Sequence, residues 1–187
     1  YTYLYNKPVI NIDYCNISEN TSNKYLYKVH NISSNIQLIN LRNYGLNIIG
    51  IFFDNAYNDN IYINLLEGVK YLKFGSQFNN NLDNLPKTLK KLTIHGNFHE
   101  QINPLPDSLK ELDLLYCCYN KPIYTLPKSL RILKLGQLFS EYLCDLPDNL
   151  ETLIIIGFFN QNLDKLPIKL KTFKIMNCCN FVFNQNI

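Results

Sequence analysis

The sequence predicts a repeat solenoid that is built mainly from β-structure. Leu-Pro pairs begin at Leu85, Leu105, Leu126, Leu146 and Leu166, in successive steps of 20, 21, 20 and 20 residues. Each pair is followed by a short apolar alternation and then, in the clearest copies, by an aromatic residue such as the Phe of Phe159-Asn160. Self-similarity at a fixed period of this size is typical of repeat proteins, in which neighbouring units stack to bury a common core.

The repeats are predicted to fill residues 44–187 as one solenoid domain. Residues 65–84 fit the same frame, with Leu66 in place of the proline. A worn copy covers about residues 44–64, and the last copy, residues 166–187, has extra residues after Ile175. We therefore expect about seven units, of which the first is degenerate.

Residues 1–43 do not carry the period, and we predict that they form an N-terminal cap. They contain two β-prone segments, residues 8–14 and 24–29, and apolar residues whose spacing resembles that of a repeat strand: Ile36, Ile39 and Leu41. A solenoid needs an atypical end unit because its last repeat would otherwise expose its core. A helical adaptor-binding module is the alternative, and the lack of a 3.6-residue period disfavours it.

Within one repeat the alternation separates an inward from an outward face. Leu92 and Ile94 are expected to point inward from a short strand, and Thr93 points outward. Proline cannot donate a ladder hydrogen bond, so each Leu-Pro pair belongs to an extended return arm with no room for a helix. The aromatic residue after each strand is expected to return to the interior, where the rings form a stack: Phe78, Phe98, Tyr119, Phe139 and Phe159.

The unit resembles two related families. Residues 89–97 are similar to the leucine-rich-repeat core, and the whole unit, with Leu-Pro and Phe159-Asn160-Gln161, more closely resembles the FNIP repeat. This resemblance implies a curved, right-handed solenoid with a parallel sheet on its concave face and a role in protein recognition. In viral members the repeats often follow an F-box, which implies substrate capture for a ubiquitin ligase in the host cytoplasm. Residues 1–43 show no F-box pattern.

Composition and charge argue against several partners. The net charge is only +3, whereas a nucleic-acid-binding domain is expected to carry a concentrated basic stripe. No run of 18 apolar residues is present, so no membrane span is expected. We therefore expect no nucleic-acid or membrane partner. No cofactor is expected either, and the resemblance implies a cytoplasmic protein that contacts other proteins.

The cysteines and histidines form no recognisable catalytic or metal motif. Two Cys-Cys pairs begin at Cys117 and Cys178, three repeats apart, or roughly 14 Å at the usual strand spacing. Zinc needs its thiolates within about 2.3 Å, so one shared site is excluded and buried free thiols are expected. The three histidines, His30, His95 and His99, fit no ligand spacing. A Cys/His enzyme on the concave face remains a minor alternative.

The outward strand positions suggest a partner-binding patch in the second half of the solenoid. Apolar and basic residues gather there at outward positions: Leu115, Ile132, Lys134, Ile154, Ile156, Lys174 and Met176. Contiguous exposed apolar area commonly marks a contact surface. The simpler interpretation is a set of tolerated β-branched residues on an exposed sheet.

The leading functional hypothesis is a non-enzymatic protein-interaction solenoid. A self-associating structural protein is the second hypothesis, because the strand expected at residues 172–176 could leave an edge open to pairing in a homodimer. The extra residues after Ile175 could instead fold over that edge as a cap.

Overall fold

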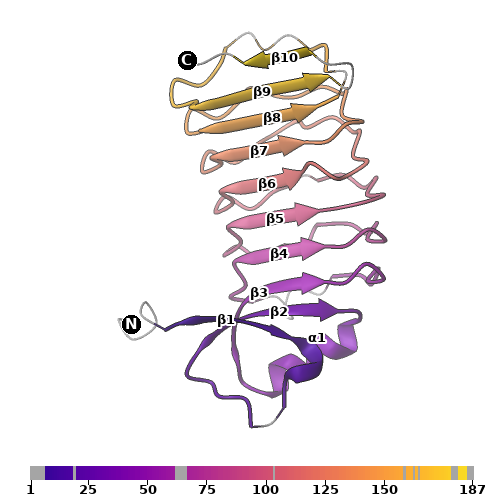
Figure 1. The fold of residues 1–187 in the computed structure, drawn as a ribbon, viewed down its shortest axis with the longest axis vertical. Helices are drawn as coiled ribbons and strands as arrows, with labels where there is room; N and C mark the ends of the chain where they lie inside the picture. The colour runs from indigo at the N-terminus through magenta and orange to yellow at the C-terminus, as the bar shows by residue number, and fades with distance from the viewer. Residues whose placement is uncertain are drawn as a thin grey trace.

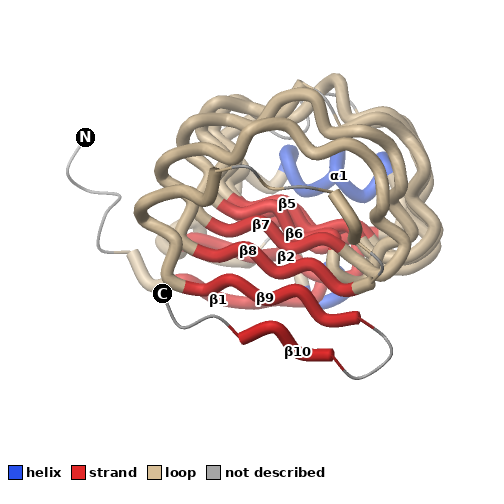
Figure 2. The backbone as a smooth tube through the Cα atoms, turned by 90° about the horizontal axis from the view of Figure 1, so that it is seen from above, coloured by secondary structure: helices blue, strands red, loops and turns tan. Residues whose placement is uncertain are grey.

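The computed structural model describes residues 7–18, 20–61, 67–102, 104–157, 159–161, 163, 165–177 and 181–184, with backbone alone for 177 and 181–184. These residues form a solenoid around one ten-stranded sheet, in which the strands follow one another in sequence order (Figure 1). Viewed along its long axis, the strands make one wall and the connecting segments arch over the opposite side (Figure 2). The predicted mainly β, helix-poor solenoid is confirmed.

The strands of the repeats are short and regularly spaced. The N-terminal part contributes β1 (Val9–Asp13), β2 (Leu26–Ile32) and β3 (Asn47–Phe53), together with a 3-10 helix at Tyr14–Asn16 and one α-helix, α1 (Asn35–Asn43). The repeats contribute β4 (Tyr71–Phe74), β5 (Lys91–Ile94), β6 (Glu111–Leu114), β7 (Ile132–Leu135), β8 (Thr152–Ile156), β9 (Thr172–Asn177) and β10 (Phe181–Asn184).

Strands β1 to β9 are parallel, and equivalent repeat positions pair with one another. Leu72 pairs with Leu92, Leu92 with Leu112, and Leu112 with Leu133. Along β4, β6 and β7, the residues that alternate with these buried positions point away from the core, as the alternation predicts. Because the register is constant from β3 to β9, each position of the repeat strand forms a column along this part of the solenoid.

The interior contains a continuous column of aromatic rings. Consecutive ring centroids lie 6.2, 5.9, 6.1, 6.3 and 6.1 Å apart, and the rings are parallel to within 22°. Its members are Tyr57, Phe78, Phe98, Tyr119, Phe139 and Phe159. All are buried, so each ring contributes the large apolar area that a short repeat otherwise lacks.

The asparagine after a ring links one repeat to the next. The side-chain oxygen of Asn58 accepts the backbone N–H of Asn79 at 2.9 Å, and that of Asn79 accepts the N–H of His99 at 2.7 Å. Asn120 accepts the N–H of Ser140 in the same way, at 2.8 Å. The Phe-Asn pair therefore combines a buried ring with an amide that satisfies the backbone of its neighbour.

The return arms are made of turns and extended segments over their described residues. In each Leu-Pro copy the proline carbonyl accepts the N–H of the leucine three residues later, as between Pro86 and Leu89 at 3.0 Å. A hydroxyl on the same turn reaches the previous repeat: Ser108 donates to the carbonyl of Leu89, and Ser129 to that of Leu109. These bonds fix the arm in the same register as the sheet.

Glycine is required where successive turns approach after the strands. Gly96 has φ +73° and Gly157 has φ +126°, in the region that other residues rarely adopt. A Cβ at Gly96 would clash with the backbone of Ser76, and one at Gly157 with the carbonyl of Gln137. Both glycines therefore set how closely neighbouring repeats can stack.

The N-terminal residues extend the same sheet. The two β-prone segments of the sequence are strands β1 and β2, which pair in parallel and continue the order into β3. The spacing of Ile36, Ile39 and Leu41, which resembles that of a repeat strand, belongs instead to a helix, because all three lie in α1. Leu41 is buried there with Leu38, while Ile36 and Ile39 are exposed, which is the spacing of a helix.

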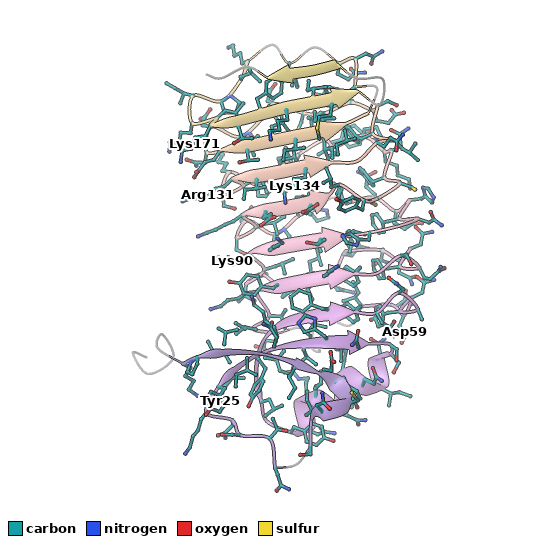
Figure 3. All side chains as sticks on the ribbon, viewed as in Figure 1. Tyr25, Asp59, Lys90, Arg131, Lys134 and Lys171 are labelled. Carbon is teal, nitrogen blue, oxygen red and sulfur yellow. The ribbon has the colours of Figure 1, made fainter. Side chains whose placement is uncertain are left out.

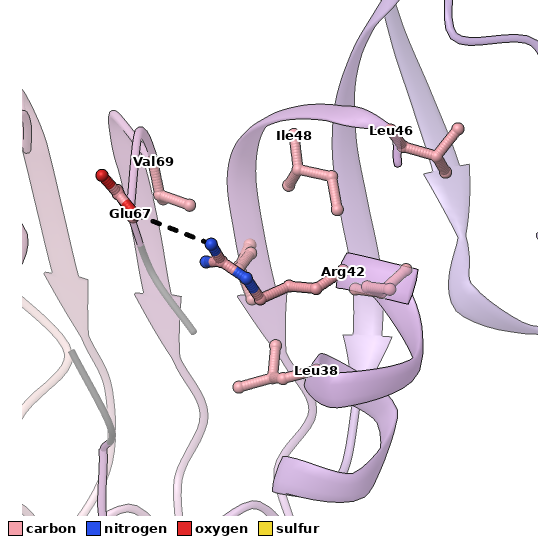
Figure 4. A pocket seen from close by; sticks show the side chains of 8 residues that line it. Leu38, Arg42, Leu46, Ile48, Glu67 and Val69 are labelled. Carbon is pink, nitrogen blue, oxygen red and sulfur yellow. Dashed lines mark ion pairs between the residues drawn. The ribbon is translucent and has the colours of Figure 1, made fainter. Parts of the chain in front are cut away.

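Helix α1 packs across the N-terminal end of the core (Figures 1 and 2). Its first N–H, on Asn35, donates to the Asp59 carboxylate at 2.9 Å, and the Asn35 side chain accepts the Tyr57 hydroxyl at 2.8 Å. Beside the helix lies a cavity of about 150 Å³ between aliphatic side chains, where Arg42 and Glu67 form an ion pair at 3.7 Å (Figure 4). The helix is thus tied to the end of the aromatic column.

At the other end, β10 turns back and pairs antiparallel with β9. The residues after Ile175 therefore cover the outer edge of β9, and β10 is the last strand of the sheet. Cys178 and Cys179 lie outside the described residues.

Candidate protein-binding surface

The outward side of the sheet, called the sheet face below, carries side chains in two main columns. The first column contains Phe52, Lys73, Thr93, Asp113, Lys134, Ile154 and Lys174, one from each of β3 to β9. The second contains Tyr71, Lys91, Glu111, Ile132, Thr152 and Thr172. Their chemistry divides the sheet face into three regions along the solenoid.

The N-terminal region is aromatic and cationic. The Lys28 ammonium lies 4.5 Å from the centre of the Tyr71 ring, across Gly50, which separates the two residues in the register. A Cβ at Gly50 would lie 2.9 Å from Cγ of Lys28, so the glycine makes room for this contact. Beside it, His30 stacks on Phe52 with centroids 4.4 Å apart. Both contacts fix side chains on an otherwise open sheet.

The central region is a cluster of four charges. Lys134 is 2.8 Å from Asp113 and 3.2 Å from Glu111, and Glu111 is 2.9 Å from Lys91 (Figure 3). Burial lowers the pKa of Lys134, but its hydrogen bonds and charge attraction to Asp113 and Glu111 outweigh that effect and raise it. Lys134 is therefore charged at neutral pH and held in place.

The predicted patch lies in the C-terminal region, on strands β7 to β9 and the turn after β6. Ile156 pairs with Met176 on the adjacent strand, and Ile154 precedes Ile156 by two residues on the same face of β8. Ile132 lies diagonally from Ile154, because its direct partner is Thr152. The structure thus brings Ile154, Ile156 and Met176 together, with Ile132 at their margin.

Leu115 is further from this group than the sequence suggests. It follows β6 in a turn, where its N–H donates to the Asp113 carboxylate at 3.2 Å. The pairing of Leu114, Leu135 and Ile155 places Gly136 between Leu115 and Ile156 in the column. Leu115 is therefore separated from the apolar group by one repeat, which has a glycine and so no side chain at the aligned position.

The two predicted lysines differ in their surroundings. Lys134 is committed to Glu111 and Asp113, whereas Lys174 is exposed and has no ion pair within the part of the chain that the structure describes. Ile154 lies between them in the column and is half-buried, as are Ile132, Ile156 and Met176. Lys174 is thus the free charge at the rim of the apolar group.

The groups that could support catalysis are poorly placed for it. Burial raises the pKa of the Cys117 thiol to about 11, so it is protonated at neutral pH and a weak nucleophile. Burial, with the nearby charge of Lys73, lowers the pKa of His95, although Asp113 acts in the opposite direction. His95 contacts the edge of the Tyr116 ring, with centroids 5.7 Å apart.

Two negative findings apply to the described residues. Among them, no group of three His, Cys, Asp or Glu side chains is arranged to hold a metal ion. Within the same residues, no helix has the length and apolarity needed to cross a membrane.

Two features of the molecule were not predicted from the sequence. The first is the place of Lys134, a predicted patch residue whose ammonium the register brings within reach of Glu111 and Asp113. The second is the partner of the Asn that follows a ring, since steps of 21 and 20 residues place Asn79 beside Asn58 and His99. The repeat register was the signal that could have revealed both.

Comparison with known families matches one segment of the chain. Residues 57–97, which include β4, β5 and the rings of Tyr57, Phe78 and Phe98, match the family described as FNIP Repeat. No curated protein matches the chain, and no solved structure does. The FNIP resemblance inferred from the Leu-Pro and Phe-Asn pattern is confirmed.

Proposed function

We propose that this chain, an FNIP-repeat solenoid, is a non-enzymatic protein-binding module whose partner contacts the C-terminal region of the sheet face. The observation that supports this proposal is the contiguous group of Ile154, Ile156 and Met176 on adjacent outward positions. Contact surfaces commonly combine an apolar centre with a charged rim, and a few anchors usually carry most of the binding energy.

The rigidity of the sheet favours this role. Strands β7, β8 and β9 form an unbroken parallel ladder over a buried core that includes Leu133, Leu153 and Ile155. A partner that docks there orders few side chains and no backbone, so less free energy is lost on binding. The ion pairs of Lys134 with Glu111 and Asp113 further restrict the side-chain motion of Lys134 at the margin of the patch.

The alternative of a Cys/His enzyme has less support. The Cys117 thiol has a raised pKa, and in the described residues no histidine is within hydrogen-bond reach of a cysteine. Native-state titration with a thiol reagent at pH 8 should show fast modification of exposed Cys15 and slow modification of Cys117. Fast modification of Cys117 would support the enzyme.

A finer assignment rests on the family resemblance alone. We propose substrate capture for a ubiquitin ligase in the cytoplasm, because related viral repeats often follow an F-box. Co-precipitation of the full-length protein with a ubiquitin-ligase scaffold tests this assignment, and a full-length protein that never associates with one would contradict it.

The test of the binding surface is a matched pair of substitutions. Ile154→Asp places a charge at the centre of the patch, whereas Ile168→Asp makes the same change at a site that is 95% exposed on a return arm. Each tagged protein is used to capture partners from an extract of the cells that make it. We expect partners retained by wild type and by Ile168→Asp to be lost with Ile154→Asp.

Folding of both variants must be checked by circular dichroism and by urea unfolding. If Ile154→Asp unfolds the protein, Ile154 is part of the core and the patch does not exist. If it folds and still captures the same partners, the binding site lies elsewhere on the molecule.

Self-association is a second candidate function. In the described sheet, β1 and β10 are each paired on one side only, so their outer backbone groups are open to another strand. Both strands are short, at five and four residues, and short edge strands resist pairing. We therefore expect a monomer in sedimentation at micromolar concentration, and a concentration-dependent dimer would favour self-association.

A further inference from the structure

A column of basic residues follows one edge of the sheet. The residue directly before each strand from β4 to β7 is Lys70, Lys90, Lys110 or Arg131, called the basic edge below. In Figure 3, Lys90 and Arg131 lie along the left edge, where the strands begin, whereas Lys134 lies on the sheet face. The basic edge is therefore distinct from the apolar group around Ile154.

The backbone holds these residues in register. The carbonyl of Lys70 accepts the N–H of Lys90 at 2.8 Å, and the carbonyl of Lys90 accepts that of Lys110 at 2.8 Å. The carbonyl of Lys110 in turn accepts the N–H of Arg131 at 2.8 Å. Successive residues of the basic edge are thus about 4.8 Å apart, the spacing of adjacent strands.

The first three lysines are not neutralised within the described residues. Further along the same column, Glu151 lies 3.0 Å from Arg131 and 2.7 Å from Lys171, so its carboxylate partly offsets the positive charge there. No ion pair or side-chain hydrogen bond involves Lys70, Lys90 or Lys110 in the same described set. Like charges on directly opposite strand positions destabilise a sheet. In this part of the column no opposite charge among the described residues offsets that repulsion.

The basic edge borders an open groove. The groove has a volume of about 490 Å³ and extends from β4 to β7, between the basic edge and the second column of the sheet face. Its other wall contains Tyr71, Lys91, Glu111 and Ile132. The Glu111 carboxylate is already neutralised by Lys91 and Lys134, so it does not exclude an anionic ligand.

We propose that this groove binds an extended acidic peptide segment, whose carboxylates lie against Lys70, Lys90 and Lys110. This inference rests on the proposed function in one respect, that the partner is a protein. The distance from Lys70 to Arg131 is three strand steps, or roughly 14 Å, which four or five extended residues span. Ile132, on the groove wall, connects this site with the apolar patch.

An acidic peptide fits the groove better than single-stranded nucleic acid does. Proteins that bind single strands place successive bases on several aromatic side chains, whereas Tyr71 is the one aromatic residue among those that line the groove. The net charge of the chain is +3, because 15 acidic residues offset 18 basic ones. With so small a net charge, the basic edge is a local feature of four residues, which suits a short anionic segment.

Binding of a labelled peptide of eight glutamates tests the proposal directly. Fluorescence anisotropy should show saturable binding to the full chain, weakening between about 50 and 200 mM salt because exposed charges are screened. A peptide of eight glutamines should not bind. The double variant Lys90→Glu, Lys110→Glu should weaken binding by at least about tenfold, since it reverses two adjacent charges in the groove.

The matched control is Lys121→Glu, Lys165→Glu, which changes the net charge equally on the return arms. This control should bind the glutamate peptide within about twofold of wild type, because distant exposed charges are screened. If both double variants lose binding equally, net charge and not the groove is responsible, and the proposal fails. It also fails if wild type does not bind the glutamate peptide at low salt.

Two further measurements separate this site from its alternatives. A single-stranded oligothymidylate that binds more tightly than the glutamate peptide, and that is lost with Lys90→Glu, Lys110→Glu, would overturn the peptide in favour of nucleic acid. Ile154→Asp should leave binding of the glutamate peptide unchanged, because Ile154 does not line the groove. A negative result with the glutamate peptide therefore does not affect the test of the apolar patch. Likewise, a negative result in partner capture does not affect the test of the groove.

Discussion

At the scale of single residues, the asparagine after an interior ring connects one repeat to the next through its side-chain amide. Asn79 accepts the backbone N–H of His99, and its own N–H is accepted by Asn58. His99 occupies the equivalent position in the next repeat. Because histidine has no side-chain amide oxygen, it cannot continue this chain of hydrogen bonds in the same way. The Phe of the same pair is buried, so the two residues of the motif have separate roles.

Asn79→Ala should lower the free energy of unfolding by about 0.5–1.5 kcal/mol, the usual net value of one hydrogen bond. The affected N–H, on His99, is exposed, so water can replace part of the lost bond. Asn81→Ala, at an exposed residue with no side-chain hydrogen bond among the described residues, is the control and should change stability very little. Urea unfolding compares the two, and equal effects would rule out a specific role for Asn79.

Tyr119 is the one ring in the middle of the column that carries a hydroxyl, and burial raises its pKa to about 12. In the unfolded chain tyrosine ionises near pH 10. The stability linked to its protonated form is therefore complete below about pH 10 and is lost as the pH rises toward 12. Tyr119→Phe, which restores the ring of most other repeats, should remove this loss.

Unfolding of wild type and Tyr119→Phe by urea at several pH values from 8 to 11 measures the effect. Below pH 10 the variant should be less stable by about 1–2 kcal/mol, because the hydroxyl donates a long hydrogen bond of 3.4 Å to Pro122 and also interacts with the Ile102 backbone and the Gln101 side chain. Above pH 10 the variant should gain stability relative to wild type. A difference that does not depend on pH would contradict a buried, protonated Tyr119.

At the scale of elements, the repeat strands could be located from the sequence, whereas α1 could not. The fixed period and the Leu-Pro pairs predict the positions of strands β4 to β9, because each strand pairs with the equivalent strand of the next repeat. The helix has no such internal template, and its apolar residues fit a strand nearly as well. Leu38 and Leu41 are selected for burial only because α1 packs on the end of the core, which is a tertiary effect.

The candidate site was predictable in part for the same reason. The sequence locates Ile154, Ile156 and Met176 at outward positions, and the register brings them together. It does not reveal that Lys134 reaches across to Glu111, because side-chain reach between strands depends on rotamers that the repeat pattern leaves open.

Gly96→Ala tests the close stacking of successive turns. A Cβ at Gly96 would meet the backbone of Ser76, and its φ of +73° is unfavourable for alanine. Gly68, with φ +81° and no atom within 4 Å of its Cβ position, isolates the second effect. We expect Gly68→Ala to lower the free energy of unfolding by about 1 kcal/mol and Gly96→Ala by clearly more, about 2–4 kcal/mol. Equal losses in urea unfolding would mean that the turns do not stack this closely.

At the scale of the whole molecule, the solenoid has a rigid sheet face whose chemistry changes along its length. Aromatic and cationic contacts near Tyr71 give way to the charge cluster around Glu111 and then to the apolar patch. The buried aromatic column, from Tyr57 to Phe159, and the amide links between some of its repeats stabilise the stacking beneath this surface. A partner that contacts two regions of the sheet face would therefore meet them at a fixed separation.

The single methionine of the chain, Met176, provides the most direct measurement of the central claim. Its methyl group, labelled with ¹³C, gives one NMR signal from within the apolar patch, beside Ile156. When a partner captured by wild type is added, we predict that this signal shifts or broadens, and that the same partner leaves the signal of Ile154→Asp unchanged. A partner that binds wild type while the Met176 signal stays unchanged would contradict the assignment of the sheet face as the binding surface.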